Sequence, residues 1–372
     1  MTRPLVIDAD GHVEEDLAWI VERLPVRVKP LAPTFRREDD GSITNLIEGR
    51  PWTPDFPFPR GKETHRSAGG ERRTGGRDPK ERLAVLDAEG IDAAVLFPSL
   101  ALMWGLYRDG PTAAALCAAG NDWTAEYCRA DPRRLVGVAV LPQQDPELAV
   151  RELERCVEVH GFVAGMIRPN KIGGRTVDDD AFDVLWAAAC ELDVPIACHE
   201  AYLGSQIDTV GHDRVRTYAA AHVISHPLEM MMGMLGVALA GVLQRFPTLR
   251  LGFLEAGCSW APYWVERIEE HYELAPSDYA GGDPRGLLNT RTWLTFEVEE
   301  KGMPFAAELG WADNICFASD YPHFDAVYPG AVKAVRERGL DPALERKVLG
   351  DNALAFYGDR LRRIVEPLAR ED

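Results

Sequence analysis

The sequence predicts an α/β fold, a (β/α)8 (TIM) barrel with a long insertion after its first strand. Eight short, nearly continuous apolar runs alternate with helical patterns along the 372 residues, which is typical of parallel strands buried on both faces. A barrel of this kind fills such a length as one domain, expected to span residues 1–372. No G-x-G-x-x-G turn follows any of the runs, so a doubly wound open sheet is the weaker alternative.

The first strand is expected to begin at Leu5 and to continue into alternating carboxylate and imidazole groups. In an extended segment Asp8, Asp10 and His12 project to the same side, where such groups can bind one divalent cation. A solvated acidic turn after an edge strand explains the same residues equally well, so the motif needs support from the rest of the chain. A short helix is predicted over residues 16–23, before Pro25.

Residues 30–80 differ in composition from the rest of the chain. They contain six prolines between Pro30 and Pro59, a glycine-rich stretch at residues 67–70 and many arginines. Because this composition resists regular structure, we expect a long loop or lid rather than a second domain. A disordered surface insertion is the equally weighted alternative.

From residue 80 the alternation is regular. Seven further strands are expected at residues 93–97, 135–141, 163–168, 194–199, 249–255, 292–297 and 314–320. Helices are expected at residues 79–90, 112–130, 146–160, 180–192, 227–246, 259–272, 303–309 and 328–339, with short helices at 341–350 and 351–357. With the first strand these make eight βα units, which favours a closed barrel.

The composition argues against several classes of partner. The 59 acidic and 41 basic residues give a net charge of −18, which repels nucleic acids and anionic membrane surfaces. No apolar run reaches the ~18 residues of a membrane span, and the N-terminus lacks a signal-peptide pattern. The seven cysteines form no C-x-x-C pair, which is typical of buried thiols in a reducing compartment. We therefore expect a cytoplasmic protein that acts on a small molecule.

Polar side chains end the predicted strands, and barrel enzymes carry their active groups at that position. These residues are Asp10, His12, Arg168, His199, Glu255, Glu297 and Asp320. Four of them, Asp10, His12, His199 and Asp320, should converge above the barrel axis, and such a mixture of imidazoles and carboxylates suits Zn²⁺, Mn²⁺ or Fe²⁺. Taken singly, each has another explanation, such as a core histidine, a helix-capping aspartate or a glutamate paired with an arginine. As a set at successive strand ends they favour a site.

Nearly the whole chain resembles the amidohydrolase superfamily. The similarity is to its amidohydrolase-related branch, which includes aminocarboxymuconate semialdehyde decarboxylase and aromatic-acid decarboxylases. The motifs that carry the resemblance are DADGH at 8–12, CH at 198–199, GVLQRFP at 241–247, EAGCSWAP at 255–262, FASDYPH at 317–323 and GDNA at 350–353.

The resemblance implies one divalent metal ion, Zn or Mn, bound by Asp10, His12, His199 and Asp320, in a barrel of the metal-dependent hydrolase type. Family members are commonly dimers, so the resemblance also implies a homodimer. Two residues depart from the family pattern. Asp10 replaces the first histidine of the usual HxH pair, and Glu255 stands where decarboxylases often have an acid/base histidine.

The function implied by the resemblance is non-oxidative decarboxylation of a small aromatic or unsaturated carboxylic acid. The alternatives are hydrolysis of a lactone, amide or ester, with Asp320 activating a metal-bound water, and a barrel that only binds a ligand. The expected catalytic residues are Asp320, Glu255 and His199, and the expected substrate contacts are Arg168, Trp104, Tyr202 and His323. For His226, which precedes Pro227, a position within reach of the site is the weaker alternative, and a surface position at the N-terminus of a helix is favoured.

Overall fold

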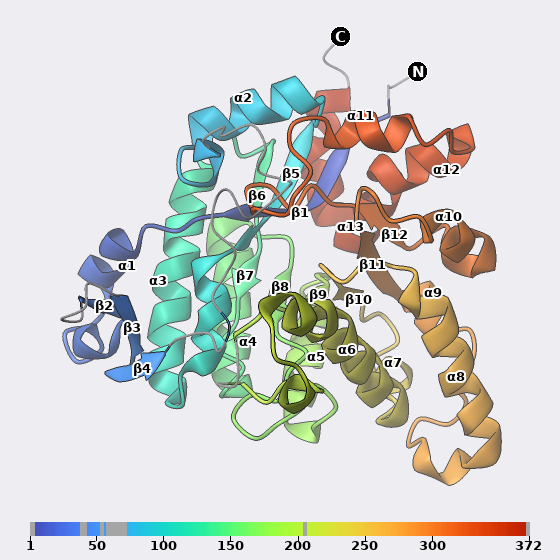
Figure 1. The fold of residues 1–372 in the computed structure, drawn as a ribbon, viewed down its shortest axis with the longest axis horizontal. Coiled ribbons are helices and arrows are strands. Elements are labelled where there is room, and N and C mark those ends of the chain that lie inside the picture. Colours follow the sequence, from blue (N-terminus) through green and yellow to red (C-terminus); the bar gives the residue numbers. More distant parts are fainter. Residues whose placement is uncertain (1–3, 38–42, 53–55, 57–72, 204–206, 370–372) are drawn as a thin grey trace.

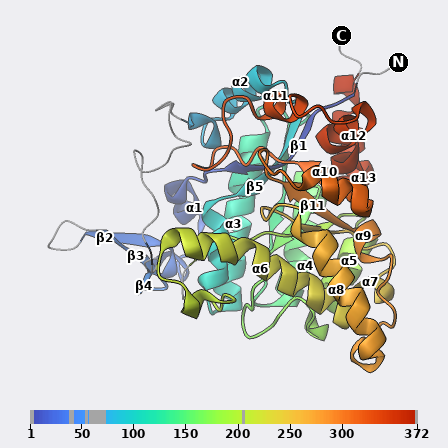
Figure 2. The ribbon, with the colours of Figure 1, turned by 45° about the vertical axis from the view of Figure 1, so that its right-hand side comes forward.

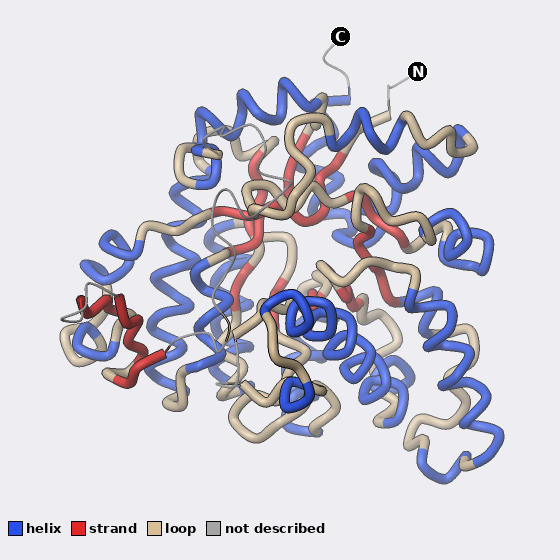
Figure 3. Tube along the Cα trace, in the orientation of Figure 1, coloured by secondary structure: helices blue, strands red, loops and turns tan. Residues whose placement is uncertain are grey.

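The computed structural model describes residues 4–37, 43–52, 56, 73–203 and 207–369 and confirms the predicted barrel architecture. Strands lie at the centre and helices surround them (Figures 1 and 3). The central strands are β1 (Ile7–Val13), β5 (Ala93–Pro98), β6 (Leu135–Gly137), β7 (Ala139–Val140), β8 (Gly165–Ile167), β9 (Ile196–Cys198), β10 (Leu251–Phe253), β11 (Thr292–Phe296) and β12 (Ile315–Phe317). Only Val138 separates β6 from β7, so this pair corresponds to the single strand predicted at residues 135–141.

Every pair of neighbouring central strands is parallel. Hydrogen bonds give the orders β1-β5-β6 and β7-β8-β9-β10-β11-β12. Beyond β12, the Asp320 amide donates to the Asp10 carbonyl over 3.1 Å, and the His12 amide donates to the Tyr321 carbonyl over 2.8 Å. These two bonds join the last strand to the first at the end of the sheet where the polar residues lie. The strands themselves are buried, as their continuous apolar sequences predict.

The helices lie between the strands in the chain and cover the barrel. They are α1 (Leu17–Arg23), α2 (Pro79–Glu89), α3 (Gly110–Cys128), α4 (Pro146–Arg155), α5 (Asp183–Glu191), α6 (Tyr218–Leu239), α7 (Val242–Arg245), α8 (Trp260–Leu274), α9 (Leu288–Arg291), α10 (Met303–Ala306), α11 (Ala331–Arg336), α12 (Pro342–Arg346) and α13 (Asn352–Val365). Several begin with an aspartate followed by proline. Asp78, Asp145 and Asp341 each accept hydrogen bonds from amides of the first turn, and the following proline already has a helical φ angle.

The insertion contains regular structure that its composition does not predict. An antiparallel sheet of β2 (Thr34–Arg37), β3 (Ile43–Ile47) and β4 (Arg50–Trp52) lies at the periphery, on the side of α1 (Figures 1 and 2). The expectation of an irregular loop is therefore wrong for this stretch. Pro51 is tolerated because β4 is an edge strand, where the ladder does not require every amide. Of the loop or lid predicted over residues 30–80, the part at residues 53–72 lies outside the described residues, apart from residue 56.

Helix α6 begins at Tyr218, well before the predicted start at residue 227. Thr217 caps the helix by accepting a hydrogen bond from the Ala220 amide, and Pro227 lies inside the helix. A proline there removes the amide that would bond to the carbonyl of Val223. Val223 lies on the solvent side of the helix, where water can bond to that carbonyl. In the described part of the chain, no helix is long and apolar enough to span a bilayer.

Replacing Asn352 by Ala should destabilise the fold by about 1–3 kcal/mol. The buried amide of Asn352 donates to the carbonyls of Ala312 (2.9 Å) and Ile315 (2.7 Å), so it connects α13 to the start of β12. Alanine leaves both carbonyls without this donor. Urea denaturation of the purified variant measures the loss, and an unchanged transition midpoint would show that the two bonds contribute nothing net.

Candidate active site and metal centre

The ends of four central strands bring carboxylates and imidazoles together. Asp10 and His12 belong to β1, His199 follows β9, Glu255 lies just after β10 and Asp320 just after β12. The sequence predicts that Asp8 shares their face, but Asp8 instead binds Arg82 and Ser319. An irregularity in the pairing of β1 between Asp8 and Gly11 breaks the strict alternation of side chains and accounts for this difference.

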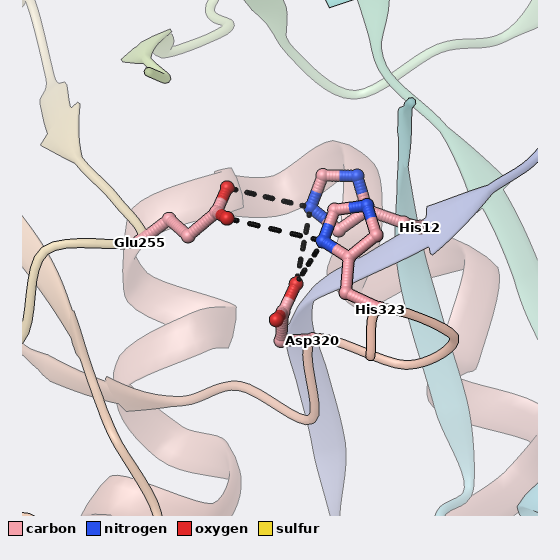
Figure 4. A group of neighbouring side chains, drawn as sticks. All are labelled: His12, Glu255, Asp320 and His323. Carbon is pink, nitrogen blue, oxygen red and sulfur yellow. Dashed lines mark ion pairs between the residues drawn. The ribbon is translucent and has the colours of Figure 1, made fainter. Parts of the chain in front are cut away.

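His12 lies at the centre of the cluster. Its Nε2 atom is 3.6 Å from Asp320 Oδ1 and 3.8 Å from Glu255 Oε2 (Figure 4). The same atom is 3.6 Å from Asp10 Oδ1. The Nε2 atom of His199 is 2.9 Å from Glu255 Oε2 and 3.4 Å from Asp10 Oδ1. Asp10, His12 and His199 therefore lie close together, and His12 also lies close to Asp320 and Glu255.

The rings of His12 and His199 are each oriented by a contact of Nδ1, the ring nitrogen that does not face the cluster. His12 Nδ1 lies 3.2 Å from the carbonyl of Pro98, and His199 Nδ1 lies 2.9 Å from the carbonyl of Glu200. A carbonyl accepts only, so each Nδ1 carries a proton, and a ring whose Nε2 gives up its own proton to a cation is left as the neutral Nδ1–H tautomer. This tautomer is the one in which histidine binds a metal through Nε2.

The cluster passes a simple test for a cation site. Asp10 Oδ1, His12 Nε2, His199 Nε2 and Glu255 Oε2 are buried and make no hydrogen bond to any described group outside the cluster. Buried polar atoms without partners are costly, and a divalent cation would satisfy all of them at once. Two overlapping groups have suitable spacing, namely Asp10, His12 and His199, and His12, Glu255, Asp320 and His323. The structure thus contains a cluster that can hold a metal ion.

The packing of acids against imidazoles shifts their pKa values. Burial lowers the pKa of His12 well below its usual value, and His323 and His199 lower it further. Burial raises the pKa of the Glu255 carboxyl to about 7, although His199 beside it acts in the opposite direction. Burial acts to lower the pKa of His323, but Asp320 together with Glu255 and Asp325 outweighs it and raises that pKa to about 9. The protonation states of these three side chains therefore cannot be inferred from the pKa values that the same groups have in water.

Backbone conformation marks two of the cluster residues. Glu255 and Asp320 have φ angles of 56° and 52°, in the left-handed region that residues other than glycine seldom adopt. The Glu255 amide donates to Thr295 Oγ1 over 2.8 Å, and the Asp320 amide is held by Asp10 as described above. Such conformations cost free energy and are common at functional sites, where they aim a side chain. Here both side chains are aimed at His12.

Comparison with known proteins agrees with this arrangement of residues. The amidohydrolase family model matches residues 7–358, which include every strand that supplies the cluster. This chain belongs to the amidohydrolase family. The resemblance inferred from its motifs is thereby confirmed.

Relatives of this amidohydrolase include decarboxylases. The 2-amino-3-carboxymuconate-6-semialdehyde decarboxylase of Dictyostelium discoideum is 26% identical over 289 residues, which cover 76% of this chain and 77% of the relative. Decarboxylase orsB of Emericella nidulans is 33% identical over 241 residues (60% and 70%). The 2-keto-4-carboxy-3-hexenedioate hydratase of a Sphingobium species is 26% identical over 298 residues (78% and 76%). The family and these relatives make the chain an enzyme of the metal-dependent carboxy-lyase or hydrolase type.

Solved structures confirm the fold. An amidohydrolase from Mycobacterium avium subsp. paratuberculosis superposes with a TM-score of 0.79 at 21% identity, covering 96% of this chain and 100% of the other. A 5-carboxyvanillate decarboxylase from Novosphingobium aromaticivorans, solved with bound manganese, gives a TM-score of 0.69 at 21% identity, covering 95% and 97%.

The predicted substrate contacts have different surroundings in this amidohydrolase. His323 belongs to the cluster, since its Nδ1 atom lies 2.7 Å from Asp320 Oδ1 and its Nε2 atom 3.0 Å from Ser99 Oγ. Tyr202 is buried beside the ring of Tyr218, at 5.8 Å between centroids. Trp104 is buried against Tyr107, at 6.2 Å between centroids, and none of its described ring contacts is with the cluster.

Arg168 is held within the protein. Its guanidinium donates to Glu200 Oε1 over 2.7 Å, to Asn170 Oδ1 over 3.0 Å and to the backbone carbonyls of Leu102 and Ala201. The side chain is buried, and these bonds fix it beside Glu200. The predicted contact with a substrate carboxylate would have to form in addition to these bonds.

His226 is the site residue whose position the sequence interpretation got wrong. It is buried in α6 instead of exposed at a helix start, because the helix begins at Tyr218. Its Nε2 atom lies 3.7 Å from Glu255 Oε1 and 3.8 Å from Glu200 Oε2. The spacing of four residues from Tyr218 through His222 to His226 continues beyond Pro227 to Met230, and this helical signal could have revealed the position.

Proposed function

We propose that this amidohydrolase catalyses the non-oxidative decarboxylation of a small aromatic or unsaturated carboxylic acid. A single divalent cation, Zn²⁺ or Mn²⁺, would be held by Asp10, His12, His199 and Asp320. The observation that carries the proposal is the set of buried atoms around His12 that have no hydrogen-bond partner outside the cluster. Two of the relatives described above are decarboxylases, which supports this choice of reaction.

The cluster has a closed base and an open rim. Asp10, His12 and His199 are buried, whereas the side chains of Glu255, Asp320 and His323 are 16%, 20% and 22% exposed. A substrate therefore approaches from the side of Asp320 and His323. A bound cation supplies the positive charge that attracts the substrate carboxylate and a neighbouring oxygen.

Proton transfer is assigned to residues of the rim. His323 Nδ1 is within hydrogen-bond distance of Asp320 Oδ1, so it can hold a proton that passes through Asp320 to the substrate carbon bearing the carboxylate. The new C–H bond forms first, the C–C bond to the carboxylate then breaks, and CO₂ leaves. Glu255 belongs to the same rim, with its Oε1 atom 3.8 Å from His323 Nδ1, and restricts the position of the substrate.

A second candidate reaction is the hydrolysis of a lactone, amide or ester. Glu255 favours it, because a carboxylate at the end of β10 replaces the imidazole that family decarboxylases often use in proton transfer. In this reaction Asp320 would accept a proton from the attacking water.

The proposal further includes a cytoplasmic location and a homodimer. Sedimentation of the purified protein tests the dimer.

Removing the metal should abolish turnover. The protein, loaded with Mn²⁺ or Zn²⁺, is incubated with 2,6-dihydroxybenzoate, 5-carboxyvanillate and a panel of lactones and esters, and CO₂ and products are measured. We expect CO₂ release that falls by about a hundredfold or more after chelation and returns when the cation is restored. Hydrolysis without CO₂ release would favour the second candidate. Activity that survives complete metal removal would contradict both.

A further inference from the structure

One face of α6 presents three polar or ionisable rings in a row. Tyr218, His222 and His226 are four residues apart, so they lie above one another on the same side of the helix. The rings of Tyr218 and His222 stack with 5.4 Å between centroids, and those of His222 and His226 are 4.8 Å apart. We refer to these three residues as the α6 ring row.

The ring row leads from the metal cluster towards the molecular surface. At its inner end His226 Nε2 lies 3.7 Å from Glu255 Oε1. Further out, His222 Nε2 lies 3.6 Å from Asp325 Oδ2, and Tyr218 contacts Phe324 at 6.5 Å between ring centroids. Asp325 and Phe324 directly follow His323 in the chain. The ring row therefore borders the same open side of the cluster as Asp320 and His323.

The composition of this helix face changes where the helix enters the core. The next residues at the same spacing, Met230 and Met234, are apolar and fully buried. By contrast, the side chain of His222 is 34% exposed, and that of His226 is 8% exposed. Methionine side chains fill the buried positions of this face, so packing alone does not require imidazoles there. The imidazoles thus occupy the half of the face that adjoins the cluster, and His222 is the one that is open to solvent.

The inner end of the row has unused hydrogen-bonding capacity. His226 Nε2 is 3.7 Å from one carboxylate and 3.8 Å from another, and both distances exceed a hydrogen bond. Glu200 Oε2, the nearer oxygen of the second carboxylate, is buried and has no hydrogen-bond partner among the described residues. Its position is fixed, because Glu200 Oε1 accepts bonds from Arg168 and Asn170. Polar atoms arranged in this way can bind an oxygen-bearing group.

We propose that the α6 ring row is the wall of the substrate site that selects for a planar substrate. Tyr218 and His222 pack against the conjugated body of the substrate, and His226 Nε2 forms a hydrogen bond with an oxygen substituent on it. The class of ligand is a planar, conjugated carboxylic acid with a hydroxyl or carbonyl oxygen near the carboxylate. This inference rests on the proposed function in one respect, which is that the carboxylate binds at the cluster.

The test uses binding, so that it does not depend on turnover. The affinity of the metal-loaded protein for 2-hydroxybenzoate, for benzoate and for the saturated 2-hydroxycyclohexanecarboxylate is measured by calorimetry. Unmodified protein should bind 2-hydroxybenzoate most tightly. His222→Leu should reduce its preference over the saturated acid by about tenfold, the upper range for one lost aromatic contact. His226→Gln should reduce the preference for 2-hydroxybenzoate over benzoate.

A matched control is available on α8. His271 is exposed and contacts Arg267 of its own helix, so His271→Leu should leave all three affinities unchanged. Equal affinity of the unmodified protein for the planar and saturated acids would overturn the inference. So would variants that lose both ligands equally together with their metal, because that pattern indicates a structural role. If His226→Gln fails to fold, His222→Leu at its part-exposed position decides alone.

The two proposals fail in different ways. If no CO₂ is released from any substrate but planar selectivity still depends on His222, the proposed reaction is wrong and the ring row remains the binding wall. If CO₂ is released and neither variant changes selectivity, the reaction stands and the ring row is not part of the site.

Discussion

Replacing Asp320 by Asn should lower turnover by about a thousandfold and leave the fold intact. Asp320 Oδ1 lies 3.6 Å from His12 Nε2 and 2.7 Å from His323 Nδ1, between the cluster and the rim. Asparagine has nearly the same shape but cannot carry a proton or a negative charge. It also tolerates the positive φ angle of this position, at which most other residues would be strained. Lost activity can then be attributed to the carboxylate.

Asp193 provides the control for this substitution. It is another aspartate with a positive φ angle, 51°, and its carboxylate forms an ion pair with Arg250 on the surface. Asp193→Asn should leave turnover unchanged. Steady-state kinetics, metal analysis and thermal unfolding are measured for both variants. If Asp320→Asn retains more than a tenth of the activity, Asp320 does not transfer the proton. If it loses the metal, its role as a ligand comes first.

The barrel could be predicted because few other folds suit its sequence pattern. Continuous apolar runs such as residues 93–97 need burial on both faces, and the helical patterns between them supply the crossovers. The insertion sheet could not be predicted in this way. The pairing of Leu46 with Pro51 depends on strand register across a short turn, and composition carries no information about register.

The residues of the site differ in how well the sequence predicts them, because they come from several different elements. Residues at strand ends, such as His12 and Asp320, follow from the fold, because all parallel strands end at one edge. His226 comes from a helix, and Pro227 suggested a helix start because proline favours the first turn. Arg168 was recognised as a strand-end residue, but its partner Glu200 follows a different strand. Whether a guanidinium binds a ligand or a neighbouring acid is not determined by its place in the sequence.

Replacing Arg82 by Met should destabilise the protein by about 3–5 kcal/mol. Arg82 of α2 and Asp8 of β1 are completely buried, and Arg82 Nη2 donates to Asp8 Oδ2 over 3.4 Å. Asp8 also accepts bonds from the amide and the hydroxyl of Ser319, at 2.8 Å and 2.6 Å. Gly11 allows this approach, because a Cβ atom there would lie 2.3 Å from Arg82 Nη2. Without Arg82 the Asp8 carboxylate is left buried with no opposing charge.

The same guanidinium positions the two segments of the chain that carry His12 and Asp320. Arg82 Nη1 donates to the carbonyls of His12 (3.1 Å) and Tyr321 (2.9 Å), so Arg82→Met should weaken metal binding as well as stability. Urea denaturation and metal titration measure the two effects. Arg77→Met is the control, because Arg77 is 74% exposed and its ion pair with Glu14 contributes little. Adding Asp8→Asn to Arg82→Met should recover part of the stability by removing the unpaired charge. A double variant no more stable than Arg82→Met alone would show that the loss comes from packing and from the two carbonyl bonds rather than from charge.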